Sequence, residues 1–227
     1  MGAGQFCTDP GIAVVVEGPD TDRFAAATRA APGQVDPQVI LTESIAEAYR
    51  CGNPVLDSRN AVRPLVTSYA AGREAGPNLY ETRVSELLAD PALGQEVFGP
   101  LGLIVLVCDL DEMLTLARGL EGRLTATLHM DGADLPHAQR LLPILECKAG
   151  RVLVNGFPTG VEVCDVMVNG GPYPTSTNFG ATSAGTMAIR RFLRPVCYQN
   201  LPGEFVSEDL RWMKTGLWPR FFTGNYS

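Results

Sequence analysis

One cysteine in this chain lies in a setting that suits a reactive nucleophile. Cys7 occurs within Gly-Gln-Phe-Cys-Thr-Asp-Pro-Gly at residues 4–11, where glycines let the backbone approach a ligand and Pro10 prevents a helix from continuing. A buried strand is predicted at residues 12–17, so the loop is anchored to a rigid element. A sulfur held in this way can attack a carbonyl group, and a backbone N–H held beside it can stabilise the resulting oxyanion. The alternative is that Cys7 is an inert, small hydrophobic residue.

Two further stretches accompany this cysteine motif at long range. Gln-Glu-Val-Phe-Gly-Pro occupies residues 95–100, and Val-Asn-Gly-Phe-Pro-Thr-Gly-Val-Glu occupies residues 154–162. Together the three motifs resemble the catalytic half of the aldehyde dehydrogenase superfamily. A closing run, Gly-Gly-Pro-Tyr-Pro-Thr-Ser-Thr at residues 170–177, resembles the branch of α-ketoglutaric semialdehyde (2,5-dioxovalerate) dehydrogenases and related NADP-dependent fatty aldehyde dehydrogenases. The resemblance covers roughly residues 2–202.

The resemblance implies a role for five residues. Cys7 would be the nucleophile that captures an aldehyde as a thiohemiacetal and then a thioester. Glu96 would hold the ribose on the nicotinamide side of a cofactor, and Phe98 would pack beside the nicotinamide. Phe157 and Val161 would line the path of the aldehyde. The plainer alternatives are a surface carboxylate for Glu96 and simple packing for the apolar side chains.

The family pattern also includes parts that this sequence does not show. Family members begin with a dinucleotide-binding domain, and we find neither its general-base glutamate nor its oxyanion-binding asparagine. Gly-Ala-Gly-Gln-Phe-Cys at residues 2–7 is no dinucleotide fingerprint, because its sixth position is cysteine and no strand precedes it. We therefore expect an α/β, parallel-sheet catalytic domain of the aldehyde dehydrogenase type that lacks the N-terminal dinucleotide-binding domain. The implied cofactor is NADP or NAD, and the chain alone is expected to be inactive.

Two other functions compete with this interpretation. The chain as given would be a non-catalytic oligomerisation or interaction domain if the missing parts are not supplied elsewhere. Alternatively, His129 or His137 would pair with Cys7 in a hydrolase or acyl transferase that needs no nucleotide. No motif accompanies either histidine: His129 falls at a predicted strand end, and His137 falls on a predicted helix after Pro136.

Composition limits the partners that the protein is expected to have. The chain has 227 residues, of which 45% are hydrophobic and 19% are charged, as in a folded globular protein. A net charge of −7 without a basic stripe argues against binding to nucleic acid. No apolar run reaches membrane-span length and no signal peptide is evident, so the cytoplasm is the expected location. The expected partners are an aldehyde substrate and further copies of the chain.

The six cysteines do not indicate a metal site or a disulfide framework. They are dispersed, without a Cys-x-x-Cys pair, and only two histidines accompany them. We expect the five cysteines other than Cys7 to be reduced packing residues, with burial of Cys108 after an apolar run and of Cys197 within Pro-Val-Cys-Tyr.

Strand and helix patterns alternate along the chain, which favours a parallel sheet covered by helices. The predicted strands span residues 12–17, 63–70, 79–84, 101–107, 126–130 and 151–155. The predicted helices span residues 20–31, 42–50, 110–119, 135–145 and 182–192, the second capped by Thr42 and ended by Gly52. Residues 161–174 are expected to be irregular. We predict a catalytic domain at residues 1–202, with a subunit-contact strand near 193–199, and a tail at 203–227.

Overall fold

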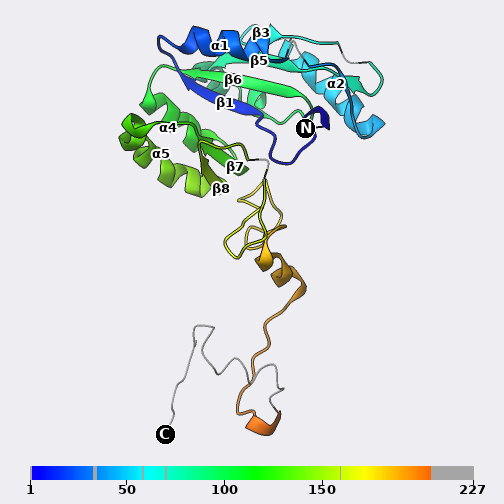
Figure 1. Ribbon diagram of the computed structural model, residues 1–227, viewed down its shortest axis with the longest axis vertical. Coiled ribbons are helices and arrows are strands. Elements are labelled where there is room, and N and C mark those ends of the chain that lie inside the picture. Colours follow the sequence, from blue (N-terminus) through cyan, green and yellow to red (C-terminus); the bar gives the residue numbers. More distant parts are fainter. Residues whose placement is uncertain (1, 33–34, 58, 70, 159, 206–227) are drawn as a thin grey trace. The chain divides into compact units, whose positions relative to one another are not determined.

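The structure of the chain is a computed structural model that describes residues 2–32, 35–57, 59–69, 71–158 and 160–205 (Figure 1). The chain divides into two compact units, Met1–Ile189 and Arg190–Ser227, and each is considered by itself. All α-helices and β-strands that the structure describes lie in the first unit. Within the described residues, no helix combines the length and the apolar character that crossing a membrane requires.

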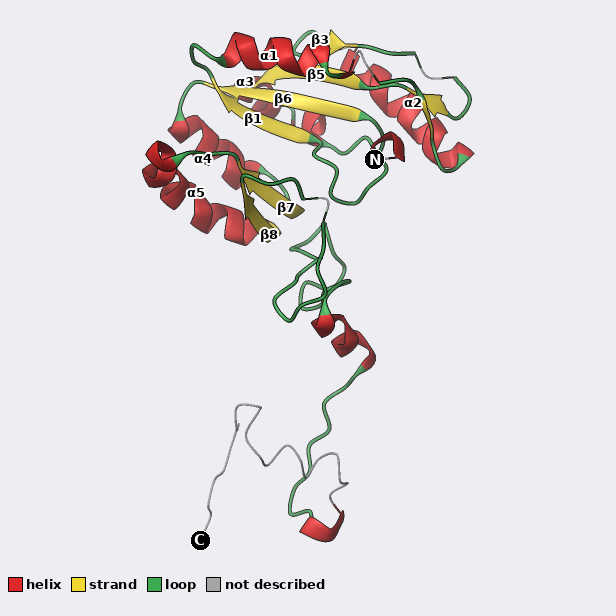
Figure 2. Ribbon diagram, viewed as in Figure 1, coloured by secondary structure: helices red, strands yellow, loops and turns green. Residues whose placement is uncertain are grey.

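A four-stranded sheet forms the centre of the first unit (Figure 2). Its strands, in spatial order, are β1 (Ile12–Val16), β6 (Leu101–Val107), β5 (Asn78–Arg83) and β3 (Arg63–Val66). β1 and β5 run parallel to β6, whereas β3 runs antiparallel to β5. β6 is an unbroken apolar run with a strand on either side, and its last five residues are buried. This pattern is the one expected of a central strand in a sheet that is covered on both faces.

In the described chain, α-helices follow most of the strands. They are α1 (Thr21–Ala30), α2 (Glu43–Asp57), α3 (Val84–Ala89), α4 (Leu110–Gly119) and α5 (Leu135–Lys148). The largest group of buried apolar side chains comes mainly from β5, β6, α3 and α4, and comprises Leu56, Val62, Tyr80, Val84, Leu87, Leu93, Leu103, Val105, Val107 and Leu116. The main sheet is therefore held from the side that carries α3 and α4.

Two smaller sheets complete the first unit. β7 (Arg123–Leu128) and β8 (Ala149–Val154) pair in parallel, joined by a crossover through α5. β2 (Gln38–Val39) and β4 (Glu74–Ala75) form a short antiparallel pair. Short 3₁₀ helices occur at Gly2–Gly4, Pro91–Gly94, Gly132–Asp134, Thr186–Phe192 and Gly203–Phe205.

The structure confirms the α/β class with a largely parallel main sheet, in which β3 is the antiparallel exception. β3 is antiparallel because the described residues between β3 and β5 form no crossover helix, and so short a connection favours antiparallel strands. β7 and β8 form a sheet of their own. The predicted strands at 12–17 and 101–107 and the predicted helix at 110–119 are confirmed.

The predicted end of the second helix at Gly52 is wrong. α2 continues to Asp57, although its start is as predicted: the Thr42 hydroxyl accepts a hydrogen bond from the Ile45 N–H at 3.3 Å. A Cβ atom at Gly52 would lie 2.9 Å from Cγ1 of Val97. The glycine therefore serves the packing of the 95–100 segment against α2, not the termination of the helix.

Three further expectations differ from the structure. α3 was not predicted, because the apolar residues of Val84–Ala89 continue the pattern of the strand before them. The predicted helix at residues 182–192 is only a 3₁₀ helix at Thr186–Phe192. Residues 193–199 lie in no strand of the described chain, so their role as a subunit-contact strand stays a prediction.

Candidate functional site

The loop that carries Cys7 is held by its own glutamine. The Gln5 side chain accepts a hydrogen bond from the Leu41 N–H at 2.7 Å and donates one to the Gly2 carbonyl at 2.7 Å. The Ala3 N–H donates to the Gln38 side-chain oxygen, also at 2.7 Å. The loop then leads directly into β1, and the Cys7 thiol is exposed and free. The glutamine of the Gly-Gln-x-Cys motif thus fixes the backbone of the loop that carries Cys7.

The second motif lies directly against this loop. Gly4 has a φ of +68°, and a Cβ atom there would lie 2.4 Å from the carbonyl oxygen of Gly99. Such an approach is possible only without a side chain. Gly99, which belongs to Glu-Val-Phe-Gly-Pro, is therefore in backbone contact with the segment three residues before Cys7. The structure brings together two motifs that are about ninety residues apart in the sequence.

A buried tyrosine packs against the second motif. Gly99 has a φ of +153°, and a Cβ atom there would lie 2.4 Å from Cδ2 of Tyr49 in α2. The Tyr49 hydroxyl accepts a hydrogen bond from the Asn78 amide at 2.6 Å. Burial raises the pKa of Tyr49, and the Asn78 hydrogen bond partly offsets this effect. Tyr49 and Asn78 are supporting residues that the sequence analysis missed, because neither lies within a motif.

The two predicted cofactor residues present their side chains to solvent. Glu96 is exposed, and none of the described residues forms a hydrogen bond or ion pair with its carboxylate. Phe98 is 38% exposed even though the neighbouring Gly99 is buried. A carboxylate without a partner among the described residues can accept hydrogen bonds, and the exposed ring of Phe98 offers an apolar surface in the same segment as Gly99.

The third motif is joined to the Cys7 loop by a hydrogen bond. The Thr8 hydroxyl, adjacent to Cys7 and buried, donates to the Pro158 carbonyl at 2.8 Å. Phe157 is 73% exposed, and its ring lies 5.7 Å from that of His129, between centroids. Val161 is 49% exposed. Of the predicted substrate residues, Phe157 therefore directly precedes Pro158, the residue that is hydrogen-bonded to the Cys7 loop.

The end of β8 fixes the start of this third loop. Asn155, with a φ of +51°, donates its backbone N–H to the Leu128 carbonyl at 2.9 Å. Its side-chain amide exchanges two hydrogen bonds with the backbone of Met130, at 2.8 and 2.9 Å. The ends of β7 and β8 are therefore locked together immediately before Phe157.

No hydrogen bond in the described part of the chain pairs either histidine with Cys7. The ring of His129 is instead tilted at 53° against that of Phe157. The Cys–His hydrolase stays a prediction without such a hydrogen bond.

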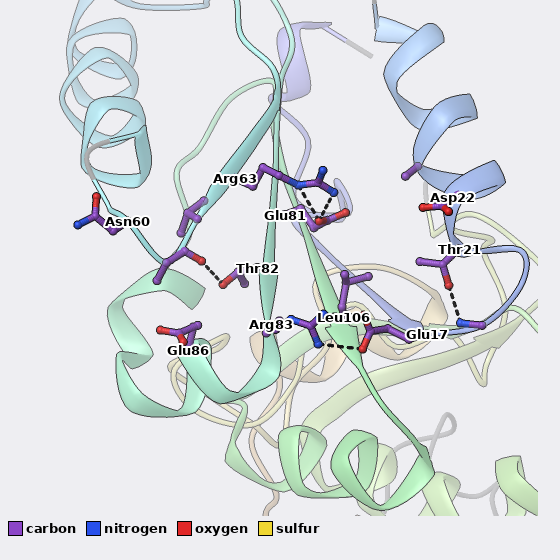
Figure 3. A pocket seen from close by; sticks show the side chains of 14 residues that line it. Glu17, Thr21, Asp22, Asn60, Arg63, Glu81, Thr82, Arg83, Glu86 and Leu106 are labelled. Carbon is purple, nitrogen blue, oxygen red and sulfur yellow. Dashed lines mark hydrogen bonds and ion pairs between the residues drawn. The ribbon is translucent and has the colours of Figure 1, made fainter.

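A cavity of about 680 Å³ lies elsewhere, where β1 and β5 end (Figure 3). Cys7 and Phe98 precede β1 and β6, so the cavity and the motifs lie at opposite ends of parallel strands. Two ion pairs lie among the residues that line the cavity: Arg83 binds both carboxylate oxygens of Glu17 at 2.9 Å, and Arg63 binds Glu81. The hydrogen bonds from Arg83 lower the pKa of Glu17. None of the predicted site residues lines this cavity.

The predicted burial of Cys108 and Cys197 is wrong. Cys197 lies in the second unit and is exposed, and Cys108 is exposed because it stands one residue beyond the buried β6. The negative charge of Glu112 raises the pKa of the Cys108 thiol, and desolvation and Glu17 act in the same direction. An exposed cysteine that favours the thiol over the thiolate is a poor nucleophile.

We therefore expect Glu112→Gln to speed the alkylation of Cys108 by iodoacetamide. Glutamine removes the charge that disfavours the thiolate, and its amide oxygen can still accept the hydrogen bond that the Cys108 N–H donates at 2.7 Å. Peptide mapping of labelled chain measures the rate at each cysteine. Glu121→Gln, which removes an equal charge elsewhere, serves as the control. An unchanged Cys108 rate in Glu112→Gln would refute the electrostatic account of its low reactivity.

Comparison with solved structures identifies the fold. The chain is similar to aldehyde dehydrogenase 21 from Physcomitrella patens in complex with the reaction product succinate, with a TM-score of 0.62 and 20% identity over 75% of this chain and 35% of that chain. It is also similar to succinic semialdehyde dehydrogenase from Streptococcus pyogenes in complex with NADP⁺ (TM-score 0.59, 18% identity, 75% of this chain and 38% of that chain). The chain has the fold of part of an aldehyde dehydrogenase.

Sequence comparison points to one branch of these enzymes. The chain is 51% identical over 213 residues to alpha-ketoglutaric semialdehyde dehydrogenase 2 of Azospirillum brasilense, covering 93% of this chain and 41% of that protein. It is 44% identical over 206 residues to the alpha-ketoglutaric semialdehyde dehydrogenase of Acinetobacter baylyi, covering 88% of this chain and 39% of that protein. No model of a protein family matches the chain. The resemblance predicted from the motifs is confirmed, and the chain spans about two fifths of the length of these relatives.

Proposed function

We propose that this chain is the catalytic part of an NAD(P)-dependent aldehyde dehydrogenase, with α-ketoglutaric semialdehyde or a similar semialdehyde as substrate. The observation that carries the proposal is the backbone contact between Gly4 and Gly99. It joins the loop of an exposed, free Cys7 to the motif of Glu96 and Phe98. The similarity in sequence to two semialdehyde dehydrogenases supports the choice of substrate.

In this proposal the protein's own chemistry begins at Cys7. Its thiolate adds to the aldehyde carbon, which forms a carbon–sulfur bond and places a negative charge on the former carbonyl oxygen. The Cys7 backbone N–H donates a hydrogen bond to that oxyanion. After loss of hydride from the same carbon, a thioester remains on Cys7. Water then breaks the carbon–sulfur bond, which releases the carboxylate and returns the thiolate.

Glu96 and Phe98 would hold the nicotinamide end of the cofactor. The free Glu96 carboxylate can accept hydrogen bonds from two ribose hydroxyls, and the exposed face of Phe98 offers an apolar surface to the ring. Bound NAD or NADP supplies the hydride acceptor. Both cofactors are compatible with these two contacts, because neither residue would touch the adenosine end.

The proposal is tested by a chimera in which this chain replaces the matched segment of the A. brasilense relative. Oxidation of α-ketoglutaric semialdehyde by the chimera, followed as reduction of NAD or NADP, is the expected result. The chain alone is expected neither to bind dinucleotide nor to turn over, because Glu96 and Phe98 cannot replace a glycine-rich turn at a helix N-terminus. A folded chimera without activity would favour the non-catalytic interaction domain instead.

Self-association is part of the proposal. Four apolar side chains early in the second unit are largely exposed: Phe192, Leu193, Val196 and Tyr198 are each more than half accessible to solvent. We propose that these residues contact a second copy of the chain, because exposed apolar side chains close together in sequence favour association. Light scattering of the chain with and without Leu193→Ser and Tyr198→Ser tests this contact.

Glu96→Gln in the chimera is expected to slow hydride transfer while leaving aldehyde capture nearly unchanged. A glutamine amide accepts fewer hydrogen bonds than a carboxylate and holds the ribose less firmly. Misplacement of a reacting group by about one ångström costs up to roughly a hundredfold in rate. Stopped-flow absorbance measures hydride transfer, and the rate of thiol loss at Cys7 measures capture. Glu86→Gln, at an exposed carboxylate in α3, is the matched control, and normal hydride transfer in Glu96→Gln would remove the ribose role.

A further inference from the structure

A single backbone carbonyl connects the nucleophile's loop, the 155–161 loop and strand β8. The Pro158 oxygen accepts a hydrogen bond from the Thr8 hydroxyl at 2.8 Å and another from the Arg151 guanidinium at 2.6 Å. A carbonyl oxygen has two lone pairs, so both are used. Arg151 also donates to the Gly160 carbonyl, two residues further along the chain.

The two donors differ in where they are anchored. Thr8 follows Cys7 directly and is only 4% exposed, so its hydroxyl has no access to bulk water as an alternative partner. Arg151 stands in β8, whose end is locked to β7 through Asn155. The position of the loop relative to β8 is thus set by Arg151, and its position relative to Cys7 is set by Thr8.

We propose that Thr8 and Arg151 are positioning residues that act together through the Pro158 carbonyl to set the gap between the Cys7 sulfur and the side chains of Phe157 and Val161. The proposal deepens the proposed function, on which it rests, by naming what defines the entrance for the aldehyde. Phe157 and Val161 flank the anchored positions 158 and 160 directly, so movement of the loop moves both side chains. Neither Thr8 nor Arg151 needs to touch the substrate.

The first test uses hydrogen–deuterium exchange of the chain itself, which requires no catalysis. In Thr8→Val, which keeps the shape and removes the hydroxyl, exchange of the backbone amides in peptides covering 155–161 is expected to rise about tenfold, as for loss of one buried hydrogen bond. Thr8→Ser restores the donor and is expected to return exchange to the original rate. Unchanged exchange in Thr8→Val, or no rescue by Thr8→Ser, would overturn the proposal.

Thr82→Val is a closely matched control. Thr82 is also 4% exposed, and its hydroxyl donates to the Ala61 carbonyl at 2.8 Å, but it stands in β5 away from the three motifs. Its substitution is expected to leave exchange at 155–161 unchanged. Equal acceleration by Thr82→Val and Thr8→Val would mean that any lost buried hydroxyl loosens the loop, and the specific role of Thr8 would fall.

Arg151→Gln tests whether Thr8 and Arg151 are coupled through the Pro158 carbonyl, an arrangement that we call the joint. Because they share an acceptor, Arg151→Gln is expected to speed exchange not only at 155–161 but also in peptides covering residues 5–9. The double variant Thr8→Val/Arg151→Gln is expected to show less than the sum of the single effects, measured as free energies. Strictly additive effects, with residues 5–9 untouched by Arg151→Gln, would show two independent contacts and would overturn the joint.

Steady-state kinetics of the chimera distinguish a positioning role from a merely structural one, because a structural role would not change KM selectively. Thr8→Val is expected to raise the KM for the semialdehyde about tenfold and to change kcat much less, because the loop positions the aldehyde without entering the chemical steps. Thr8→Ser is expected to keep both constants. An equal loss in kcat with an unchanged KM would overturn the entrance role. If the exchange results hold while the parent chimera is inactive, the joint stands and the proposed function fails.

Discussion

Cys7→Ser is expected to reduce aldehyde oxidation by the chimera about a thousandfold or more, since removal of a catalytic nucleophile typically costs this much. A serine hydroxyl is almost wholly protonated at neutral pH, and among the described residues no base is hydrogen-bonded at position 7 that would activate it. Substitution of sulfur by oxygen changes little in volume, and the side chain is exposed. Loss of activity would therefore report on chemistry and not on folding. Steady-state reduction of NAD or NADP measures the loss.

Cys147→Ser is the matched control for this prediction. Cys147 is also exposed and free, but it lies in α5, away from the three motifs. It is expected to keep full activity, and alkylation by iodoacetamide is expected to inactivate the chimera in step with labelling of Cys7. Retention of more than about a tenth of the activity in Cys7→Ser would remove Cys7 as the nucleophile. Inactivation that follows the labelling of Cys147 would do the same.

The motifs visible in the sequence are the segments that the structure brings together, but the sequence does not show how they meet. Gly4 and Gly99 were visible as parts of motifs, because residues that must approach a backbone closely are restricted to glycine. The hydroxyl of Thr8 carries no comparable signal, since a threonine in a loop is common and its acceptor lies 150 residues further on. The Thr8–Pro158 bond depends on where two loops are placed in space, and no local pattern encodes that placement.

The errors in the predicted fold have the same origin. Gly52 carries the local signature of a helix end, yet α2 continues because the glycine makes room for Val97. The antiparallel direction of β3 follows from what lies between β3 and β5, and not from the strand pattern itself. The contact between Tyr49 and Gly99 was also not predicted, because it arises from the packing of α2. A residue outside every motif therefore supports the segment that carries the predicted cofactor contacts. Local propensity predicted the elements, and tertiary packing decided their ends and partners.

Gly4→Ala is expected to lower the free energy of unfolding of the chain by about 3 kcal/mol or more, combining left-handed strain with overpacking. The φ of +68° disfavours any residue with a Cβ atom, and that atom would lie 2.4 Å from the Gly99 oxygen and 2.8 Å from the Pro100 nitrogen. Both contacts are with backbone, which cannot rotate away as a flexible side chain can. Urea denaturation followed by circular dichroism measures the change.

Gly2→Ala separates the two causes. Gly2 has a φ of +42°, and a Cβ atom there would have nothing within 4 Å. Its substitution carries the backbone strain alone, for which about 1–2 kcal/mol is expected. The difference between the variants, about 1–3 kcal/mol, therefore measures the contact between the two motifs. If Gly4→Ala costs no more than Gly2→Ala, Gly4 and Gly99 are not in contact in solution. The proposed grouping of Cys7 with Glu96 and Phe98 would then lose the contact on which it rests.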